Sequence, residues 1–351
     1  MAVSISMDGV YRHIQDLFQR GTVIIIGSGA SCAYGLPSMS DLAQHLLETI
    51  PGKLPSEDQQ SELEWTRIAS ALADQSALET ALGVNPLPDA LVDLLMTEVG
   101  IRVARSEGAA IANIFGSEIS PFGRLFAHIL RSAQIVDVVT TNYDRLIEVQ
   151  AARAGIRVDS MYYGHTVGRL NAELSRDELL MTGTSIVRSS RTVLLRPRPH
   201  IRLSKPHGSL DWFEQGGDYF RTDLAIPGSR QIIAPGGNKY RLGYEVPFDQ
   251  QRQRANQAID AAASLLTVGY GFNDEHLQTH LERKFSQVPA VVISRTLTEN
   301  ARAYLQSSSR AIGIEALGDG SRCVVSTADD SLEIDLPLWD LNHLAREVLS
   351  I

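Results

Sequence analysis

Cysteine is almost absent from this chain of 351 residues, in which Cys32 and Cys323 are the only two. Two cysteines cannot build a disulfide framework, and a structural zinc site made of cysteine alone needs about four. No apolar run approaches the roughly 20 residues of a membrane helix, and the first residues lack the charged-then-apolar order of a signal peptide. We therefore expect a reduced, cytoplasmic protein that does not contact a membrane.

Positive charge is also in the minority, because 32 Lys and Arg face 41 Asp and Glu, a net charge of −9. This balance argues against a protein dominated by phosphate-backbone contacts, so we expect no direct nucleic-acid binding, although a local anion site remains compatible. A P-loop and a Gly-x-Ser-x-Gly elbow are missing as well. The hydrophobic content of 44% is ample for a sizeable core, and the length fits two domains or one large α/β domain with insertions.

Short apolar runs alternate with helical patterns along the chain. Buried strands are predicted at 23–26, 135–139, 262–268 and 290–293. Strands that alternate with helices favour a parallel sheet with right-handed crossovers. We therefore predict a single α/β domain over 1–351, with a Rossmann-like parallel sheet flanked by helices and a last helix over 338–348.

Two segments interrupt this alternation. Residues 51–132 carry little strand signal and predict helices at 61–82, 88–105 and 121–132, so we expect a helical insertion between the first two core strands. Residues 155–205 mix short β-like pieces with polar loops, which predicts an irregular β-containing insertion. The arginines of this second segment either attract phosphate or lie on solvated hairpin faces, and the pattern favours the latter.

A glycine loop follows the first predicted strand, with Gly27, Ser28, Gly29, Ala30 and Ser31 in succession. A strand that ends in Gly-x-Gly before a helix lets backbone N–H groups approach a pyrophosphate. The last glycine of the dehydrogenase fingerprint would fall at Cys32, so that pattern is broken. The loop by itself fits either a phosphate site or a tight strand–helix turn.

Two further polar motifs follow predicted strands, where open α/β sheets bind ligands. The first is Thr140-Thr141-Asn142-Tyr143-Asp144, and the second is Lys205-Pro206-His207-Gly208-Ser209. The Asn142 amide can both donate and accept hydrogen bonds, and we place it on an exposed turn. His207 suits a base because the ordinary pKa of histidine lies near neutral pH. A plain turn and a structural histidine are the alternatives.

The order of a glycine loop, a Thr-x-Asn-x-Asp turn and a His-Gly pair resembles the sirtuin-like family. The resemblance implies a pocket that holds NAD and breaks its nicotinamide–ribose bond, with Asn142 and His207 as the catalytic residues. The Gly-Leu-Pro step that ends in Leu36 and Pro37 matches the family as well. Asp41 follows this step, and it either reaches the bound NAD or only starts a helix.

A looser match lies at the end of the third predicted strand, where Gly269-Tyr270-Gly271-Phe272 stands in place of the Gly-Thr-Ser turn of deacylases. The family contacts phosphates and adenosine there and at the end of the next strand; a plain strand–helix turn is the alternative. The resemblance thus implies a set of residues in contact with NAD: Gly27, Ser28, Gly29, Ala30, Ser31, Leu36, Pro37, Asp41, Thr141, Asp144, Gly269, Tyr270, Gly271, Phe272 and Ser294.

The chain also departs from the deacylases at Ser38-Met39-Ser40-Asp41, where most of them carry an Asp-Phe-Arg-like run, and after the His-Gly pair. Those enzymes carry a four-cysteine zinc module after the His-Gly pair, whereas residues 211–254 contain no cysteine. We therefore expect no zinc and no other metal, and water as the acceptor. The sequence is more similar to the bacterial sirtuin-like NAD hydrolases of anti-phage defence, including those encoded beside a HerA-like ATPase. The alternatives are a zinc-free protein deacylase or ADP-ribosyltransferase, and a non-catalytic module that senses NAD or ADP-ribose.

That resemblance implies an NAD glycohydrolase controlled by homo-oligomer formation and by a HerA-like ATPase partner. Two predicted helices carry apolar faces that could serve such contacts, with Leu91, Leu94 and Leu95 on one and Leu341, Leu344 and Val348 on the other. Ordinary packing within the chain is the favoured alternative for both faces.

Overall fold

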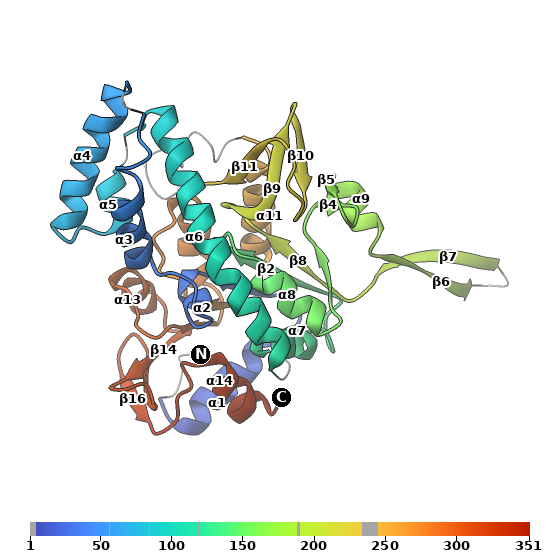
Figure 1. Cartoon of the computed structure of the whole chain (residues 1–351). Helices are drawn as coiled ribbons and strands as arrows, with labels where there is room; N and C mark the ends of the chain where they lie inside the picture. Colours follow the sequence, from blue (N-terminus) through green and yellow to red (C-terminus); the bar gives the residue numbers. More distant parts are fainter. Residues whose placement is uncertain (1–4, 56, 84, 118–119, 188–189, 234–244) are drawn as a thin grey trace.

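The structure, a computed structural model, describes residues 5–55, 57–83, 85–117, 120–187, 190–233 and 245–351 (Figure 1). The elements up to the second core strand are α1 (Met7–Leu17), β1 (Thr22–Ile26), α2 (Ser28–Cys32), α3 (Met39–Thr49), α4 (Gln59–Ala73), α5 (Leu78–Leu82), α6 (Asp89–Gly116), α7 (Pro121–Ile129) and β2 (Ile135–Thr140). Next come α8 (Leu146–Arg153), β3 (Arg157–Asp159), β4 (Tyr162–Tyr163), β5 (Gly168–Leu170), α9 (Ala172–Asp177), β6 (Leu180–Val187), β7 (Ser190–Pro197), β8 (His200–Ser204), β9 (Gly208–Gln215), β10 (Asp218–Arg221) and β11 (Ser229–Ile232). The chain ends with α11 (Phe248–Ala261), β12 (Ser264–Val268), α12 (Glu275–Phe285), β13 (Ala290–Ile293), α13 (Glu299–Gln306), β14 (Ala311–Leu317), β15 (Arg322–Ser326), β16 (Ser331–Ile334) and α14 (Leu341–Leu349).

The main sheet has the strand order β16-β15-β14-β13-β12-β1-β2-β8-β3. Strands from β14 to β3 pair in parallel, and β15 and β16 are antiparallel to their neighbours. The central strands β1, β12 and β13 are buried along their whole length. Parallel strands that are covered on both faces are largely apolar, which explains why hydrophobic residues predominate in each of them.

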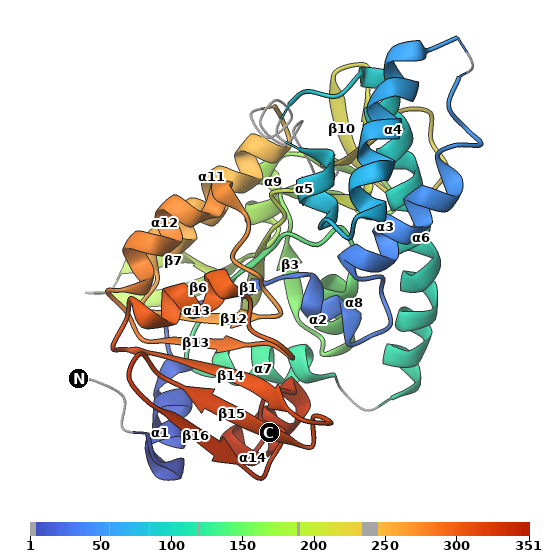
Figure 2. The same ribbon diagram turned by 90° about the vertical axis from the view of Figure 1, so that its left-hand side faces the viewer.

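Helices cover both faces of this sheet (Figure 2). Because successive side chains of a strand point to opposite faces, Ile24 and Ile26 of β1 pack in one cluster with α1, α7 and α14. Val23 and Ile25 pack in the second cluster with α11, α12 and α13. The predicted α/β fold, a parallel sheet flanked by helices, is therefore confirmed.

The helices α3 to α6 form a third hydrophobic cluster beside the end of the sheet (Figure 1). This cluster also contains Leu146 of α8 and Leu210 of β9, which flank the two polar motifs along the chain. The segment 51–132 therefore packs against the elements that carry the candidate site. Its α5 and α6 both contribute residues to the cavity described below.

Part of the segment 155–205 belongs to the main sheet, which was not expected: the segment supplies the strands β3 and β8. It also begins a second, antiparallel sheet of order β11-β9-β10-β5-β4. The strands β6 and β7 pair as a hairpin that projects from the body (Figure 1). The designation of the whole segment as an insertion is therefore wrong for β3 and β8.

Two details of the predicted elements also differ from the structure. The helix expected over 61–82 is two helices, separated by a bend at Gln75, whose φ is +62°. The strands β14 to β16 and the helix α11 were not predicted, since their alternating or polar sequences give only a weak periodic signal.

Both apolar faces considered for partner contacts are packed inside the chain. Leu91 and Leu95 are buried in the helical cluster, where Leu94 is partly buried, and Leu341, Leu344 and Val348 are buried against the sheet. The alternative of ordinary packing is therefore correct for these residues. None of the helices in the described part of the chain has the length and hydrophobicity that a membrane crossing requires.

Candidate active site

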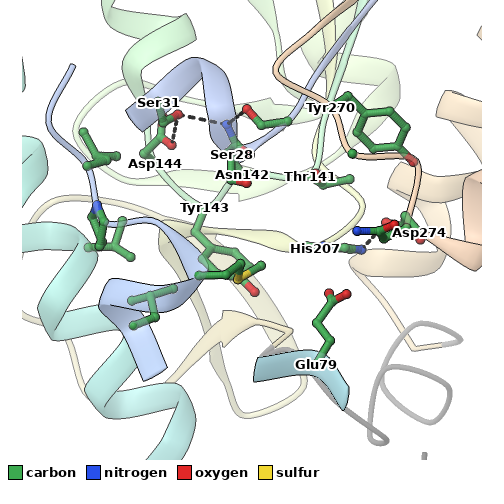
Figure 3. Close-up of a pocket in the computed structure, with 18 residues that line it drawn as sticks. Ser28, Ser31, Glu79, Thr141, Asn142, Tyr143, Asp144, His207, Tyr270 and Asp274 are labelled. Atoms are coloured by element: carbon green, nitrogen blue, oxygen red, sulfur yellow. Dashed lines mark hydrogen bonds and ion pairs between the residues drawn. The ribbon is translucent and has the colours of Figure 1, made fainter. Parts of the chain in front are cut away.

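A cavity of about 160 Å³ lies where β1, β2, β8 and β12 end (Figure 3). Ligands of open α/β sheets bind at the carboxyl ends of the strands, and this cavity has that position. It is lined by Gly27, Ser28, Ser31, Leu36, Pro37, Met39, Leu42, Glu79, Val103, Thr141, Asn142, Tyr143, Asp144, His207, Tyr270, Gly271, Asn273 and Asp274. The glycine loop, the Thr-x-Asn-x-Asp turn and the His-Gly pair thus meet at one place.

The loop after β1 and the loop after β12 touch backbone to backbone. The N–H groups of Gly27 and Gly29 donate to the carbonyls of Val268 and Gly269, both at 3.0 Å. A Cβ at Gly27 would clash with Gly269, and one at Gly269, where φ is +59°, would clash with Ala30. Only glycine fits this contact. The two glycine N–H groups therefore hold the loops together. They are not free to bind a pyrophosphate, although the sequence pattern had predicted that they would.

The Asn142 side chain is held in a defined orientation. Its Nδ2 donates to the Gly27 carbonyl and to Ser31 Oγ, both at 2.9 Å (Figure 3). The expectation of an exposed turn is wrong, since Asn142 is only 9% exposed. With Nδ2 used in this way, the amide presents Oδ1 to the cavity. Asn142 is thus prepared to accept a hydrogen bond from a ligand hydroxyl.

Asp144 shapes the loop from within. Its Oδ2 accepts from Ser31 Oγ at 2.7 Å and its Oδ1 accepts from the Leu146 N–H at 3.1 Å. Burial raises the pKa of Asp144, an effect that the Lys205 ammonium opposes. Since both carboxylate oxygens are engaged, Asp144 orients Ser31, and through it Asn142, at the start of α8.

Lys205 is the buried cation behind this turn. It is 1% exposed, and its Nζ donates to the Asp144 carbonyl at 2.5 Å, to Ser209 Oγ at 3.0 Å and to Glu148 Oε1 at 3.2 Å. Burial raises the pKa of Glu148, and again Lys205 opposes the shift. The ammonium group therefore ties the turn after β2 to the strand that carries His207.

His207 faces a carboxylate. Its Nε2 lies 2.6 Å from Asp274 Oδ2, and both residues are buried, at 6% and 5% exposure (Figure 3). The angles of this contact depart from those of a good hydrogen bond, and it is a charged pair only when the imidazole carries a second proton. Gly208 follows with φ of +82°, at a point where a Cβ would clash with Gln231. The backbone thus requires glycine at position 208.

A second cavity, of about 450 Å³, lies on the other side of the glycine contact. Gly29, Ala30, Gly269 and Ser294 line it, and Ser120, whose buried hydroxyl has no partner among the described residues, lines it as well. Three arginines line it, Arg124, Arg295 and Arg346, with Asp340 the one acid among the described lining residues.

The two cavities have opposite charge. Glu79, Asp144 and Asp274 line the first cavity, and no lysine or arginine is among its described lining residues. The glycine contact therefore separates an acidic cavity from a mainly basic one. A ligand that spans both should carry positive charge at one end and negative charge at the other.

Most of the residues expected to contact NAD line one of the two cavities, and two do not. Asp41 forms a capping box with Ser38 at the start of α3 and is exposed. Its pKa is lowered by the hydrogen bonds from Ser38. Phe272 is fully buried between Phe285 and Tyr304. Both are therefore placed in structural roles.

Sequence reasoning missed three charged residues of the site. Asp274 follows the glycine turn after β12 by a few positions, and Lys205 is part of the His-Gly motif. The place of each residue beside a motif could therefore have indicated it. Glu79 had none, because it lies in the helical segment far from every motif. In the residues that the structure describes, no group of three or more His, Cys, Asp or Glu is arranged to hold a metal ion.

A comparison with models of known protein families gave a match. A family model described as the SIR2-like domain matches residues 136–309 of the chain. No curated protein matches the chain.

Solved Sir2 structures are similar to the chain at low identity. A triple mutant of Sir2 homologues with 2′-O-acetyl ADP ribose shares 14% identity at a TM-score of 0.42, over 85% of this chain and 88% of that chain. A Sir2 homologue mutant with ADP ribose shares 11% at 0.42, over the same fractions. A Sir2 homologue–NAD complex shares 14% at 0.36, over 86% and 87%. With TM-scores this low, these similarities carry no argument about the site.

Replacing the buried lysine should destabilise the fold. In the Lys205→Met variant the Glu148 carboxylate loses its buried partner, so we expect a loss of about 3 kcal/mol in the free energy of unfolding, measured by urea denaturation. The double variant Lys205→Met/Glu148→Leu should recover much of this loss, because no charge remains unpaired. Arg169→Met, which breaks an exposed pair with Asp218, is the control and should cost less than about 1 kcal/mol. A single variant as stable as the wild type would contradict the role of Lys205.

Proposed function

We propose that the protein is an NAD hydrolase that cleaves the nicotinamide–ribose bond and releases nicotinamide and ADP-ribose. The observation that carries the proposal is the opposite charge of two cavities that meet at the glycine contact. NAD has the same distribution, since its nicotinamide ring is a cation and its phosphates are anions. The SIR2-like match over residues 136–309 supports the same class of ligand.

Charge complementarity sets the proposed orientation of NAD. The nicotinamide riboside enters the acidic cavity, and the adenosine end enters the cavity with Arg124, Arg295 and Arg346. Between them, the pyrophosphate passes the contact of the glycine loops. Ser28 lies between the two glycines Gly27 and Gly29 in the sequence, and it lines the acidic cavity.

The chemistry needs few groups. The transition state is a ribosyl oxocarbenium ion, and nicotinamide leaves as a neutral molecule, so no strong acid is required. Asn142 Oδ1 accepts a hydrogen bond from a ribose hydroxyl and holds the sugar in the reactive position. His207 takes up a ribose hydroxyl proton as positive charge develops on the sugar. Asp274 stabilises the imidazolium that forms, because its carboxylate already lies against Nε2.

The proposed biological role is depletion of NAD in anti-phage defence, controlled by homo-oligomer formation and by a HerA-like ATPase partner. It is supported by the order of the three motifs and by the lack of cysteine in residues 211–254. A zinc-free deacylase would instead release more nicotinamide when an acyl-lysine peptide is added. A non-catalytic sensor would bind NAD or ADP-ribose without turnover. Nicotinamide release from NAD by the purified protein tests the proposal directly.

Control by assembly predicts that the active protein is larger than one chain. Light scattering during size-exclusion chromatography should give a mass of at least two chains, and NAD cleavage should increase when the HerA-like ATPase is added. The measurement needs the full chain at the concentration used for the activity assay. A strictly monomeric protein with full activity would contradict this control, while leaving the hydrolase reaction intact.

Asn142→Ala should reduce kcat for nicotinamide release by about 10²-fold or more, because the ribose loses a positioned contact. Ser31→Ala is the matched control, since it removes one partner of Asn142 Nδ2 but keeps the Oδ1 acceptor. We expect this control to lose less than about tenfold. Circular dichroism and thermal unfolding should be compared for both variants. Wild-type turnover in Asn142→Ala would exclude this turn from the chemistry.

His207→Ala should lose turnover but still bind NAD, because a base acts mainly in the transition state. Asp274→Asn keeps the imidazole and removes the charge behind it, so kcat should fall by about tenfold or more while KM changes by less than about threefold. Isothermal titration with NAD measures the binding. If affinity and turnover fell together in His207→Ala, the residue would bind substrate and would not act as a base.

A further inference from the structure

The short helix α5 brings a carboxylate to the candidate active site from outside the SIR2-like match. Leu78, Ala81 and Leu82 of this helix are buried in the helical cluster. Glu79 is half-buried and lines the acidic cavity. Figure 3 shows its carboxylate pointing toward the part of the cavity where His207 and Asp274 lie. The helical segment therefore takes part in the site and is more than a cover for it.

The position of α5 is held by an arginine of the neighbouring helix. Arg67 of α4 donates from Nη1 to the Ala81 carbonyl at 3.1 Å and from Nη2 to the Leu82 carbonyl at 3.5 Å. The charge of Glu79 also reaches other residues of the cavity. Burial raises the pKa of Tyr143, and the charge of Glu79 raises it further. Burial also raises the pKa of Tyr270, and Glu79 is one of several nearby groups that add to this shift.

Hydrolysis has a second proton to place. When the C1–N1 bond of NAD breaks, its electron pair stays on nicotinamide, which leaves neutral, and C1 becomes an oxocarbenium carbon. A water oxygen then forms the new C1–O bond. The water loses one proton and His207 returns its proton to the ribose hydroxyl, so the balanced products are nicotinamide, ADP-ribose and one H⁺. A carboxylate at the solvent side of the cavity can accept that proton during attack.

The other acids of the cavity are poorly suited to this step. Both oxygens of Asp144 accept hydrogen bonds from Ser31 and Leu146. Asp274 lies buried against His207. Glu79 is the most exposed of the three acids. It lies on α5, whereas the residues proposed to act on the ribose, Asn142 and His207, lie in loops that follow strands of the main sheet.

We infer that Glu79 is a catalytic residue that accepts the proton of the attacking water. This inference rests on the proposed NAD hydrolysis and adds a residue that no sirtuin-like motif contains. It separates two roles: His207 acts on the sugar, and Glu79 acts on the nucleophile. It follows that only reactions with a proton-bearing nucleophile depend on Glu79.

The experiment compares two nucleophiles in the same assay. Labelled nicotinamide can attack the ribosyl cation through its ring nitrogen and re-form NAD, and this exchange releases no proton. Glu79→Gln should reduce hydrolysis by about 10²-fold, the usual scale for loss of a general base, and should change exchange by less than about threefold. The ratio of exchange to hydrolysis should therefore rise more than about 30-fold. Glu79→Asp should regain part of the hydrolysis.

Glu62→Gln is the control, because it removes one carboxylate from an exposed position on α4. It should leave both rates at the wild-type level. An equal fall of hydrolysis and exchange in Glu79→Gln would mean that Glu79 only shapes the cavity, and unchanged rates would mean that it has no part; either outcome overturns the inference. A wild-type protein that releases no nicotinamide would contradict the proposed function itself, before any variant is measured.

Discussion

The contact between the loop after β1 and the loop after β12 determines the geometry of the candidate site. Gly27 and Gly29 lie directly against Gly269, with backbone hydrogen bonds between the loops and no room for a Cβ. The contact divides the space at the end of the sheet into an acidic and a basic cavity. A larger residue at either side would separate the loops and open the two cavities into one.

Behind the cavity, a chain of hydrogen bonds fixes the residues proposed for the chemistry. It runs from Lys205 to the Asp144 backbone, and from the Asp144 side chain through Ser31 to Asn142. Each bond engages a group that would otherwise be free to bind ligand, so the network leaves Asn142 Oδ1 pointing outward. A buried ammonium group is costly unless it is well bonded. Lys205 meets this condition, with four hydrogen-bond partners: Tyr143 O, Asp144 O, Glu148 and Ser209.

Much of the fold could be predicted because its central strands are buried on both faces. The run Val23–Ile26 has no polar residue and is followed directly by Gly27, so the sequence alone indicates a core strand. The strands β14 to β16 at one side of the sheet escaped prediction, since partial exposure mixes polar and apolar residues within them. Asn142 and His207 were found because the motifs that contain them resemble those of the sirtuin-like family, and both lie near the carboxyl ends of parallel strands, which converge.

The sequence by itself determined the α/β class, the positions of the core strands and the three polar motifs, because these depend on local hydrophobic pattern and on chain direction. Only the tertiary structure decided what surrounds those motifs. Glu79 reaches the cavity through the packing of α5, and Asp274 meets His207 through the pairing of β12 with β1. Likewise Asp41 and Phe272, adjacent to the motifs along the chain, lie outside both cavities. Contacts between residues far apart in the chain depend on how elements pack, and local sequence carries little information about them.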